Sequence, residues 1–235
     1  MFRFTNKMLL LFLLFVLSAR AHEQLLLVVA EDMNRSSALL QRFSHTQEGW
    51  EKVGPAIPVN LGRNGLGWGI GLLPVKHAVS DPIKHEGDGR APAGIFALGP
   101  VFGTLPAAQT AMPYLQATGN LICIDDGRSS AYNRIAAIAP ELEFRSFEWM
   151  RRKDGLYALG VVVQHNTAAV PGRGSCIFLH IEHGPGAGTA GCTSMNTRSL
   201  SKIVRWLDPS KAPLLVQIPR KSLPSVQQRF KGLGE

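Results

Sequence analysis

The distribution of glycine and proline constrains this chain more than any other feature. The sequence has 24 glycines and 15 prolines in 235 residues, and they are spread through the middle of the chain instead of forming one linker. Short apolar stretches lie between them, a pattern typical of a β-rich domain. We expect a mostly antiparallel sheet with strands at 25–30, 38–43, 50–61, 94–98, 121–124, 156–164, 176–182 and 213–218.

Two stretches have a helical pattern. Residues 146–153 predict a short helix, and residues 197–207 predict a second one with stronger support. In the second stretch, apolar residues recur at i, i+3, i+4 and i+7, and Thr197 or Ser199 is the expected N-cap.

The N-terminal segment 1–21 differs from the rest of the chain. Arg3 and Lys7 precede an apolar run from Met8 to Leu17, and small residues follow. This pattern predicts a secretory signal peptide, because the apolar run is about half the roughly 20 residues that a membrane-spanning helix requires. We therefore expect one domain at 22–219, with no membrane span after cleavage, in the periplasm or cell envelope.

The charge of the chain bears on its partners. Removing residues 1–21 takes away Arg3, Lys7 and Arg20 and leaves 22 basic and 17 acidic residues, a net charge of +5. With no run of Lys and Arg longer than three residues and only 8% aromatic residues, this balance favours an anionic polymer over a nucleic acid as partner. A basic surface without a partner is the alternative. We expect a monomer with a loosely held basic, polar tail at 220–235.

The segment 175–195 carries the clearest chemical pattern. His180 lies near the end of an apolar strand, and Cys192 ends the glycine-rich loop that follows. A thiol needs a nearby base to react at neutral pH, and glycines allow the loop to fold back onto the strand. The pattern predicts Cys192 as nucleophile and His180 as general base, with the amides of Ala190, Gly191 and Cys192 as an oxyanion hole.

Three other interpretations of this segment stay open. Residues 186–193 match a phosphate-binding loop except at its lysine. His180, His183 and a cysteine could ligate zinc, although residues three apart on a strand point to opposite faces. Cys192 could also be a buried small hydrophobe and His180 a core histidine with its hydrogen bonds satisfied.

The same segment resembles the YkuD-type L,D-transpeptidases, whose signature is a strand histidine followed by S/T-x-G-C. Thr189, Gly191 and Cys192 stand at the signature positions, and His180 stands at the position of the family's general base. Residues 84–96 are similar to the family's Gly-Asp-x-x-Thr-Pro-x-Gly stretch, with alanine in place of the threonine.

This resemblance covers roughly residues 25–219. It implies a mainly β fold: a single L,D-transpeptidase-like β-sandwich or barrel domain with a few short helices, one of them after the catalytic cysteine. It also implies a cysteine acyltransferase of the bacterial cell wall that needs no metal or cofactor.

In the reaction that the resemblance implies, Cys192 attacks the carbonyl at the L-centre of a diamino acid in a peptidoglycan stem tetrapeptide and expels the terminal D-alanine. An amine then resolves the thioester and forms a cross-link, or water resolves it and gives carboxypeptidase activity. The alternatives are a hydrolase of the same fold that cuts cross-links or wall-protein attachments, and a non-catalytic wall-binding module.

One departure from the family affects substrate recognition. Many members have an arginine two residues after the cysteine, where this chain has Ser194. Recognition of a carboxylate would then fall to Arg90 or Arg134. The motifs themselves supply Arg90, Thr189 and Ser194 as expected substrate-binding residues. Two more are Tyr132, which follows an Asp-Asp-Gly-Arg turn, and His165, which lies at a strand end; both positions are ones where site residues often occur.

The chain has three cysteines, so one is left over if two form a disulfide. If Cys192 is the nucleophile it must stay free, and Cys123 and Cys176 are then the pair. The alternative is two separately buried thiols, because sequence alone cannot bring two Cα atoms within the roughly 7 Å that a disulfide requires.

Overall fold

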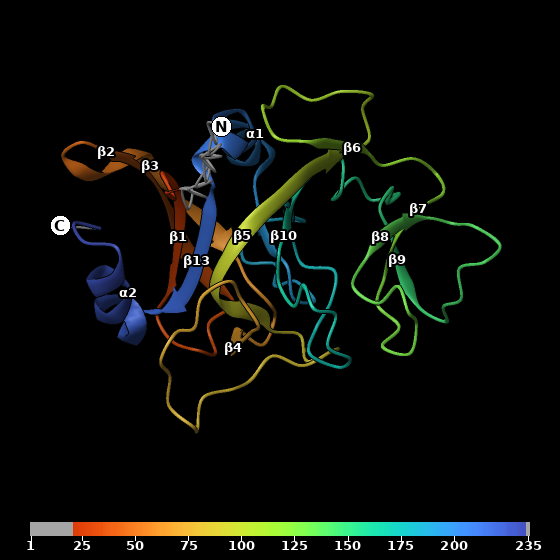
Figure 1. Cartoon of the computed structure of the whole chain (residues 1–235), viewed down its shortest axis with the longest axis horizontal. Coiled ribbons are helices and arrows are strands. Elements are labelled where there is room, and N and C mark those ends of the chain that lie inside the picture. Colours follow the sequence, from red (N-terminus) through yellow and green to blue (C-terminus); the bar gives the residue numbers. More distant parts are fainter. Residues whose placement is uncertain (1–20, 234–235) are drawn as a thin grey trace, which may run out of the picture.

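The computed structural model describes residues 21–233, so all but the last residue of the predicted signal peptide lies outside the described residues. Within the described part the chain is mainly β, with two short α-helices (Figure 1). Within the same range, no helix combines the length and the apolar character that a membrane crossing requires.

A closed β-barrel forms the body of the molecule. The order of its strands is β10-β11-β12-β3-β2-β1-β13-β5, and pairing between β5 and β10 closes the ring. Most strand pairs in the described chain are antiparallel, as predicted. The barrel strands are β1 (Gln24–Ala30), β2 (Ser37–Thr46), β3 (Gly49–Asn60), β5 (Ala91–Gly103), β10 (Leu159–Val163), β11 (Phe178–Ile181), β12 (Thr193–Met195) and β13 (Leu214–Pro219).

The most apolar strands lie side by side in this barrel. β1 and β13 are buried along almost their whole length and pair in parallel, which fits strands that are covered on both faces. Helix α1 (Thr197–Trp206) packs against β10 and β11 and buries Leu200, Ile203 and Val204. The helix lies where the sequence predicts it, but Asn196 caps it, with Oδ1 accepting the Ser199 N–H at 2.9 Å.

A second, three-stranded sheet lies to one side of the barrel (Figure 1). It consists of β7 (Leu121–Ile124), β8 (Ile135–Ala137) and β9 (Phe147–Trp149), with β7 in the centre. Two further short strands, β4 (Leu66–Trp68) and β6 (Tyr114–Gln116), pair with β5 of the barrel.

The helix predicted at 146–153 is wrong. Residues 147–149 form strand β9 instead, which pairs with β7 so that Trp149 lies opposite Ile122 and Phe147 opposite Ile124. Aromatic residues on either side of Glu148 favour a strand, and a helix this short is too weak on its own to compete with the pairing.

The expectation of a loosely held tail is also wrong. After a 3-10 turn (Arg220–Ser222), residues Leu223–Arg229 form helix α2. Val226, Phe230 and Leu233 are buried in the main apolar core, and the Phe230 ring meets the Trp50 ring edge-on at 5.9 Å. These apolar residues recur at helical spacing, so the signal was present within a basic, polar segment. A short 3-10 turn (Pro209–Lys211) leads into β13.

Candidate active site

Cys192 lies at the end of the glycine-rich loop that connects β11 to β12. These two strands are parallel neighbours, and His180 on β11 is paired with Ser194 on β12. The loop therefore returns Cys192 to the strand that carries His180, as the sequence pattern predicts. Glycine is required in the loop at Gly188, where a Cβ atom would lie 2.7 Å from the backbone of Arg63.

The Cys192 thiol is enclosed by the backbone that leads into β11. Its Sγ accepts the Phe178 N–H at 3.3 Å and donates to the Cys176 carbonyl at 3.5 Å. Burial raises the pKa of the thiol to about 12, and the charge of Glu148 acts in the same direction, against smaller opposing effects of the Phe178 N–H and the Tyr157 hydroxyl. The resting thiol is therefore neutral, and attack requires removal of its proton.

His180 has the tautomer that a general base needs. Its Nδ1 lies 2.7 Å from the carbonyl oxygen of Ile181. A carbonyl can only accept, so Nδ1 carries the proton and Nε2 has the free lone pair. Burial lowers the pKa of the imidazole, which keeps it neutral at pH 7. The Tyr157 ring meets the imidazole edge-on at 5.2 Å.

His180 and Cys192 line one cavity of about 400 Å³. No hydrogen bond joins the two side chains within residues 21–233. Catalytic hydrogen bonds are often long or poorly aligned without substrate and tighten in the complex, so the shared cavity is the relevant geometry.

Thr189 holds the turn that presents Cys192. Its Oγ1 accepts the Gly191 N–H at 3.1 Å and donates to the Cys192 carbonyl at 2.6 Å. This bond occupies the Gly191 amide, so the predicted oxyanion hole loses that donor and keeps the amides of Ala190 and Cys192 as candidates. Thr189 lines the cavity, but its hydroxyl is used for the turn.

The two arginines expected to hold substrate lie elsewhere. The Arg90 guanidinium donates to the carbonyls of Met33 and Leu66 and to the Asn34 side chain. Arg134 donates to the Thr167 carbonyl. Neither arginine is among the residues that line the cavity; both donate to backbone carbonyls instead.

Tyr132 and His165, also predicted to bind substrate, lie outside the cavity lining too. Tyr132 is 1% exposed, and its hydroxyl donates to the carboxylate of Glu86, a residue that lines the cavity. His165 is 2% exposed, no hydrogen bond reaches either ring nitrogen, and burial lowers its pKa to about 3. Asn133 links the two regions, since its side chain donates to the His165 carbonyl and accepts the Cys176 N–H.

Ser194, another of the residues predicted to bind substrate, lines the cavity. Its side chain is 1% exposed, and its Oγ has no hydrogen-bond partner in the described chain.

The rest of the cavity wall includes six charged or aromatic side chains that the sequence did not single out. They come from the loop before β5, from the small sheet and from the segment after it: Lys84, Glu86, Asp125, Glu148, Arg152 and Tyr157. The Tyr157 hydroxyl donates to Glu148 at 2.6 Å. Glu148 was hidden within a segment predicted to be helical, whereas Asp125 follows an apolar strand directly, a position where site residues often occur.

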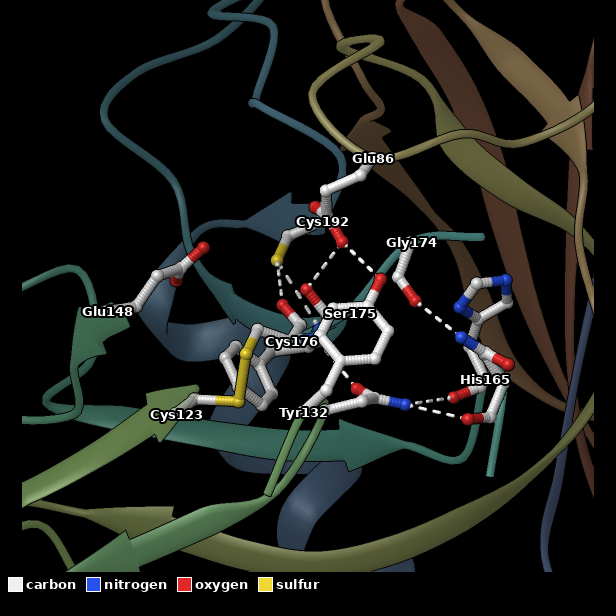
Figure 2. The surroundings of a disulfide bond; sticks show 12 residues. Glu86, Cys123, Tyr132, Glu148, His165, Gly174, Ser175, Cys176 and Cys192 are labelled. Carbon is white, nitrogen blue, oxygen red and sulfur yellow. Dashed lines mark hydrogen bonds between the residues drawn. A yellow bond between two sulfur atoms is a disulfide. The ribbon is translucent and has the colours of Figure 1, made fainter. Parts of the chain in front are cut away.

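A disulfide joins Cys123 of β7 to Cys176, and Cys192 is the free cysteine, in agreement with the predicted pairing. The Cα atoms of the pair are 6.0 Å apart. Figure 2 shows that the Cys192 sulfur is directed at the carbonyl of Cys176, next to this disulfide. The bond thus ties the small sheet to the backbone that surrounds the candidate nucleophile.

Comparisons of the chain with protein-family models, curated proteins and solved structures found no match. Among residues 21–233 no three His, Cys, Asp or Glu side chains are arranged to hold a metal ion, so the zinc alternative lacks a ligand set there.

Proposed function

We propose that this protein is an exported cysteine acyltransferase that acts on peptidoglycan stem peptides through a thioester on Cys192. The observation that carries the proposal is the single cavity lined by both Cys192 and His180, with the imidazole proton fixed on Nδ1 by the Ile181 carbonyl. The closed barrel and the loop from β11 to β12 are compatible with an L,D-transpeptidase fold, whose assignment is part of the proposal.

The chemistry follows from the roles of these two side chains. His180 Nε2 takes the thiol proton as Cys192 Sγ attacks the carbonyl carbon at the L-centre of the diamino acid. The amides of Ala190 and Cys192 are the candidate donors to the oxyanion. Collapse of the intermediate breaks the C–N bond to D-alanine, whose amine takes the proton from His180 and leaves a thioester on Cys192.

The second half of the reaction returns the enzyme to its resting state. An amine of another stem peptide attacks the thioester and loses a proton to His180, the C–S bond breaks, and the proton passes to the Cys192 thiolate. If water attacks instead, the product is a shortened stem peptide.

The raised pKa of the buried thiol favours a second candidate, a non-catalytic wall-binding module in which Cys192 only fills space. Treatment of the purified protein with a carbapenem distinguishes the two. The acyltransferase gains the mass of the opened drug on the peptide that contains Cys192, and the C192A variant, with an unchanged circular dichroism spectrum, gains none. If the wild-type protein gains no mass after prolonged incubation with the drug, the binding module is favoured.

Incubation with muropeptides then separates transfer from hydrolysis. A cross-linked dimer with loss of D-alanine supports transpeptidation, and a tripeptide product supports carboxypeptidase activity. Cleavage of pre-formed cross-links without either product supports the hydrolase of the same fold. In each case C192A should lower the rate by at least about 1,000-fold, because the nucleophile is lost.

A further inference from the structure

Three carboxylates face the cavity that contains Cys192. Glu86 precedes β5, Asp125 follows β7, and Glu148 lies in β9, so separate parts of the chain bring them together. Burial is the largest cause that raises the pKa of Glu148, and the Tyr157 hydroxyl and the Arg152 charge lower it. The three carboxylates are close enough that Asp125 and Glu86 both raise this pKa by charge repulsion. Figure 2 shows the carboxyl groups of Glu148 and Glu86 on opposite sides of the Cys192 sulfur.

These carboxylates have no salt bridge within residues 21–233. Glu86 accepts the hydroxyls of Tyr132 and Ser175, and Glu148 accepts the hydroxyl of Tyr157. Neutral donors satisfy hydrogen-bonding capacity but leave the charge uncompensated.

The two cations on the same wall, Lys84 and Arg152, each form an ion pair with a carboxylate outside the cavity lining, although the charge of Arg152 also acts on Glu148 and that of Lys84 on Cys192. Lys84 is buried and donates to Asp88 and to the His85 carbonyl. Arg152 makes hydrogen bonds to both oxygens of Asp154. The cavity therefore presents an excess of negative charge next to the thiol.

Unpartnered polar atoms at the same place provide a second, independent observation. The Ser194 Oγ, in a residue that is 1% exposed, and the Asp125 Oδ1 are both buried without a hydrogen-bond partner in the described chain, and both residues line the cavity. Buried polar atoms without partners are rare in folded proteins, and here they point to a ligand that carries hydrogen-bond donors.

We propose that the cavity beside Cys192 is selective for a substrate that carries a primary ammonium group, held by Glu148 and Asp125 with Ser194 and Glu86 at its edge. An ammonium has three donors and a positive charge, which matches the unpartnered oxygens and the uncompensated carboxylates. The cavity wall therefore carries negative charge, whereas many YkuD-type members have a positively charged arginine at the position of Ser194. This inference rests on the proposed function for the identity of the substrate, but the charge selection of the thiol can be tested without turnover.

The first experiment compares two thiol reagents of opposite charge on the full mature chain. Aminoethyl methanethiosulfonate is cationic and sulfonatoethyl methanethiosulfonate is anionic; each forms a disulfide with Cys192 and releases methanesulfinate. With rates normalised to those of 2-mercaptoethanol, the cationic reagent should label Cys192 at least about tenfold faster than the anionic one.

Variants identify the source of this preference. E148Q and D125N keep the side-chain shape and remove one charge each, so each should lower the ratio about two- to fivefold. E141Q, which removes an exposed carboxylate outside the cavity, is the matched control and should leave the ratio unchanged. A wild-type ratio near one, a preference for the anionic reagent, or a ratio that E148Q and D125N leave intact would overturn the proposal.

The second experiment asks which reactant carries the ammonium. Stem tetrapeptide donors with a free or an acetylated side-chain amine are compared, with hydroxylamine as a small acceptor that converts the thioester to a hydroxamate. If acetylation of the donor lowers the rate of hydroxamate formation, and lowers it less in E148Q than in the wild type, the ammonium belongs to the donor. If both donors react at equal rates and cationic acceptors are preferred, the ammonium belongs to the acceptor. Absence of hydroxamate from both donors would count against the proposed function, while the labelling ratio still decides this inference.

Discussion

The barrel and the three-stranded sheet are held together in different ways. The barrel surrounds the larger apolar core and has strands as long as the 13 residues of β5. The strands of the small sheet are three or four residues long, and a second apolar cluster that contains all three cysteines lies beside it. Three short strands are near the lower limit for independent stability, so the small sheet depends on its attachment to the barrel.

The two regions also contribute differently to the candidate site. The barrel supplies Cys192 and His180, while the small sheet and the turn after β7 supply Glu148 and Asp125. The comparison indicates that the barrel positions the reacting groups and the small sheet sets the charge around them.

The largest expected effect comes from removing the disulfide. The bond joins two cysteines with a sequence separation of 53, so it closes a long loop in the unfolded chain. The double variant C123S/C176S should therefore lose about 4 kcal/mol of unfolding free energy. Urea denaturation of the variant and the wild type measures this loss.

Hydrogen exchange locates the same effect. Amides of residues 121–149 should exchange faster in C123S/C176S, while those of β1 and β13 keep their protection relative to global unfolding. If protection falls equally in both regions, the small sheet is not held separately by the disulfide, and the two regions are not stabilised in different ways.

The converse experiment removes an anchor of the barrel. Phe230 is 8% exposed and packs on Trp50. F230A should cost about 3 kcal/mol through the cavity that it leaves. The exposed neighbouring substitution Q228A is the matched control and should have little effect. Thermal denaturation measures both variants, and a result for F230A no larger than that for Q228A would restore the interpretation of a loosely held tail.

The sequence predicted the barrel better than the small sheet for a physical reason. Each of the eight expected strands is present, because short apolar stretches between turn residues are a local signal. The strands that were missed, β4, β6, β8, β9 and β12, have three residues each and are determined by their partners. Closure of the barrel between β5 and β10 is likewise a tertiary event.

The candidate site divides in the same way. Cys192 and His180 were predicted because one short segment of sequence contains both and joins them by a flexible loop. Glu148 comes from a distant segment whose helical interpretation concealed it, and only the pairing of β9 with β7 brings it to the cavity. Arg90 lies outside the cavity lining, with its guanidinium donating to the backbone carbonyls of Met33 and Leu66, and contacts of this kind are not visible in a sequence.

A smaller effect is expected from replacing His180, the barrel residue proposed as the general base. The thiol, with its pKa of about 12, stays protonated at neutral pH unless a base removes its proton. H180Q should therefore slow iodoacetamide labelling of Cys192 at pH 7 by about 100-fold, since the base is lost. The rate should recover as the pH rises and hydroxide replaces the base. H183Q, a change on the same cavity wall, is the matched control.

The pH profile of wild-type activity tests the direction of the His180 pKa shift independently. Burial lowers the pKa of His180 below 6.5. The neutral base then persists to lower pH than for an exposed histidine, and the acid limb of activity should lie below that of an ordinary imidazole. The same pH profile for labelling of H180Q and the wild type would show that His180 does not act on the thiol.

The smallest expected effect separates bracing from binding at Arg90, whose guanidinium donates to the carbonyls of Met33 and Leu66. A charged donor to a partly buried carbonyl contributes about 2 kcal/mol. R90A should therefore lower the unfolding free energy by about that amount while KM and kcat stay at wild-type values below the melting temperature. R90K is the informative companion, because an ammonium cannot reproduce the planar arrangement of donors and should recover only part of the stability. A raised KM in R90A at unchanged stability would return Arg90 to the substrate site and require a rearrangement of the loop before β5.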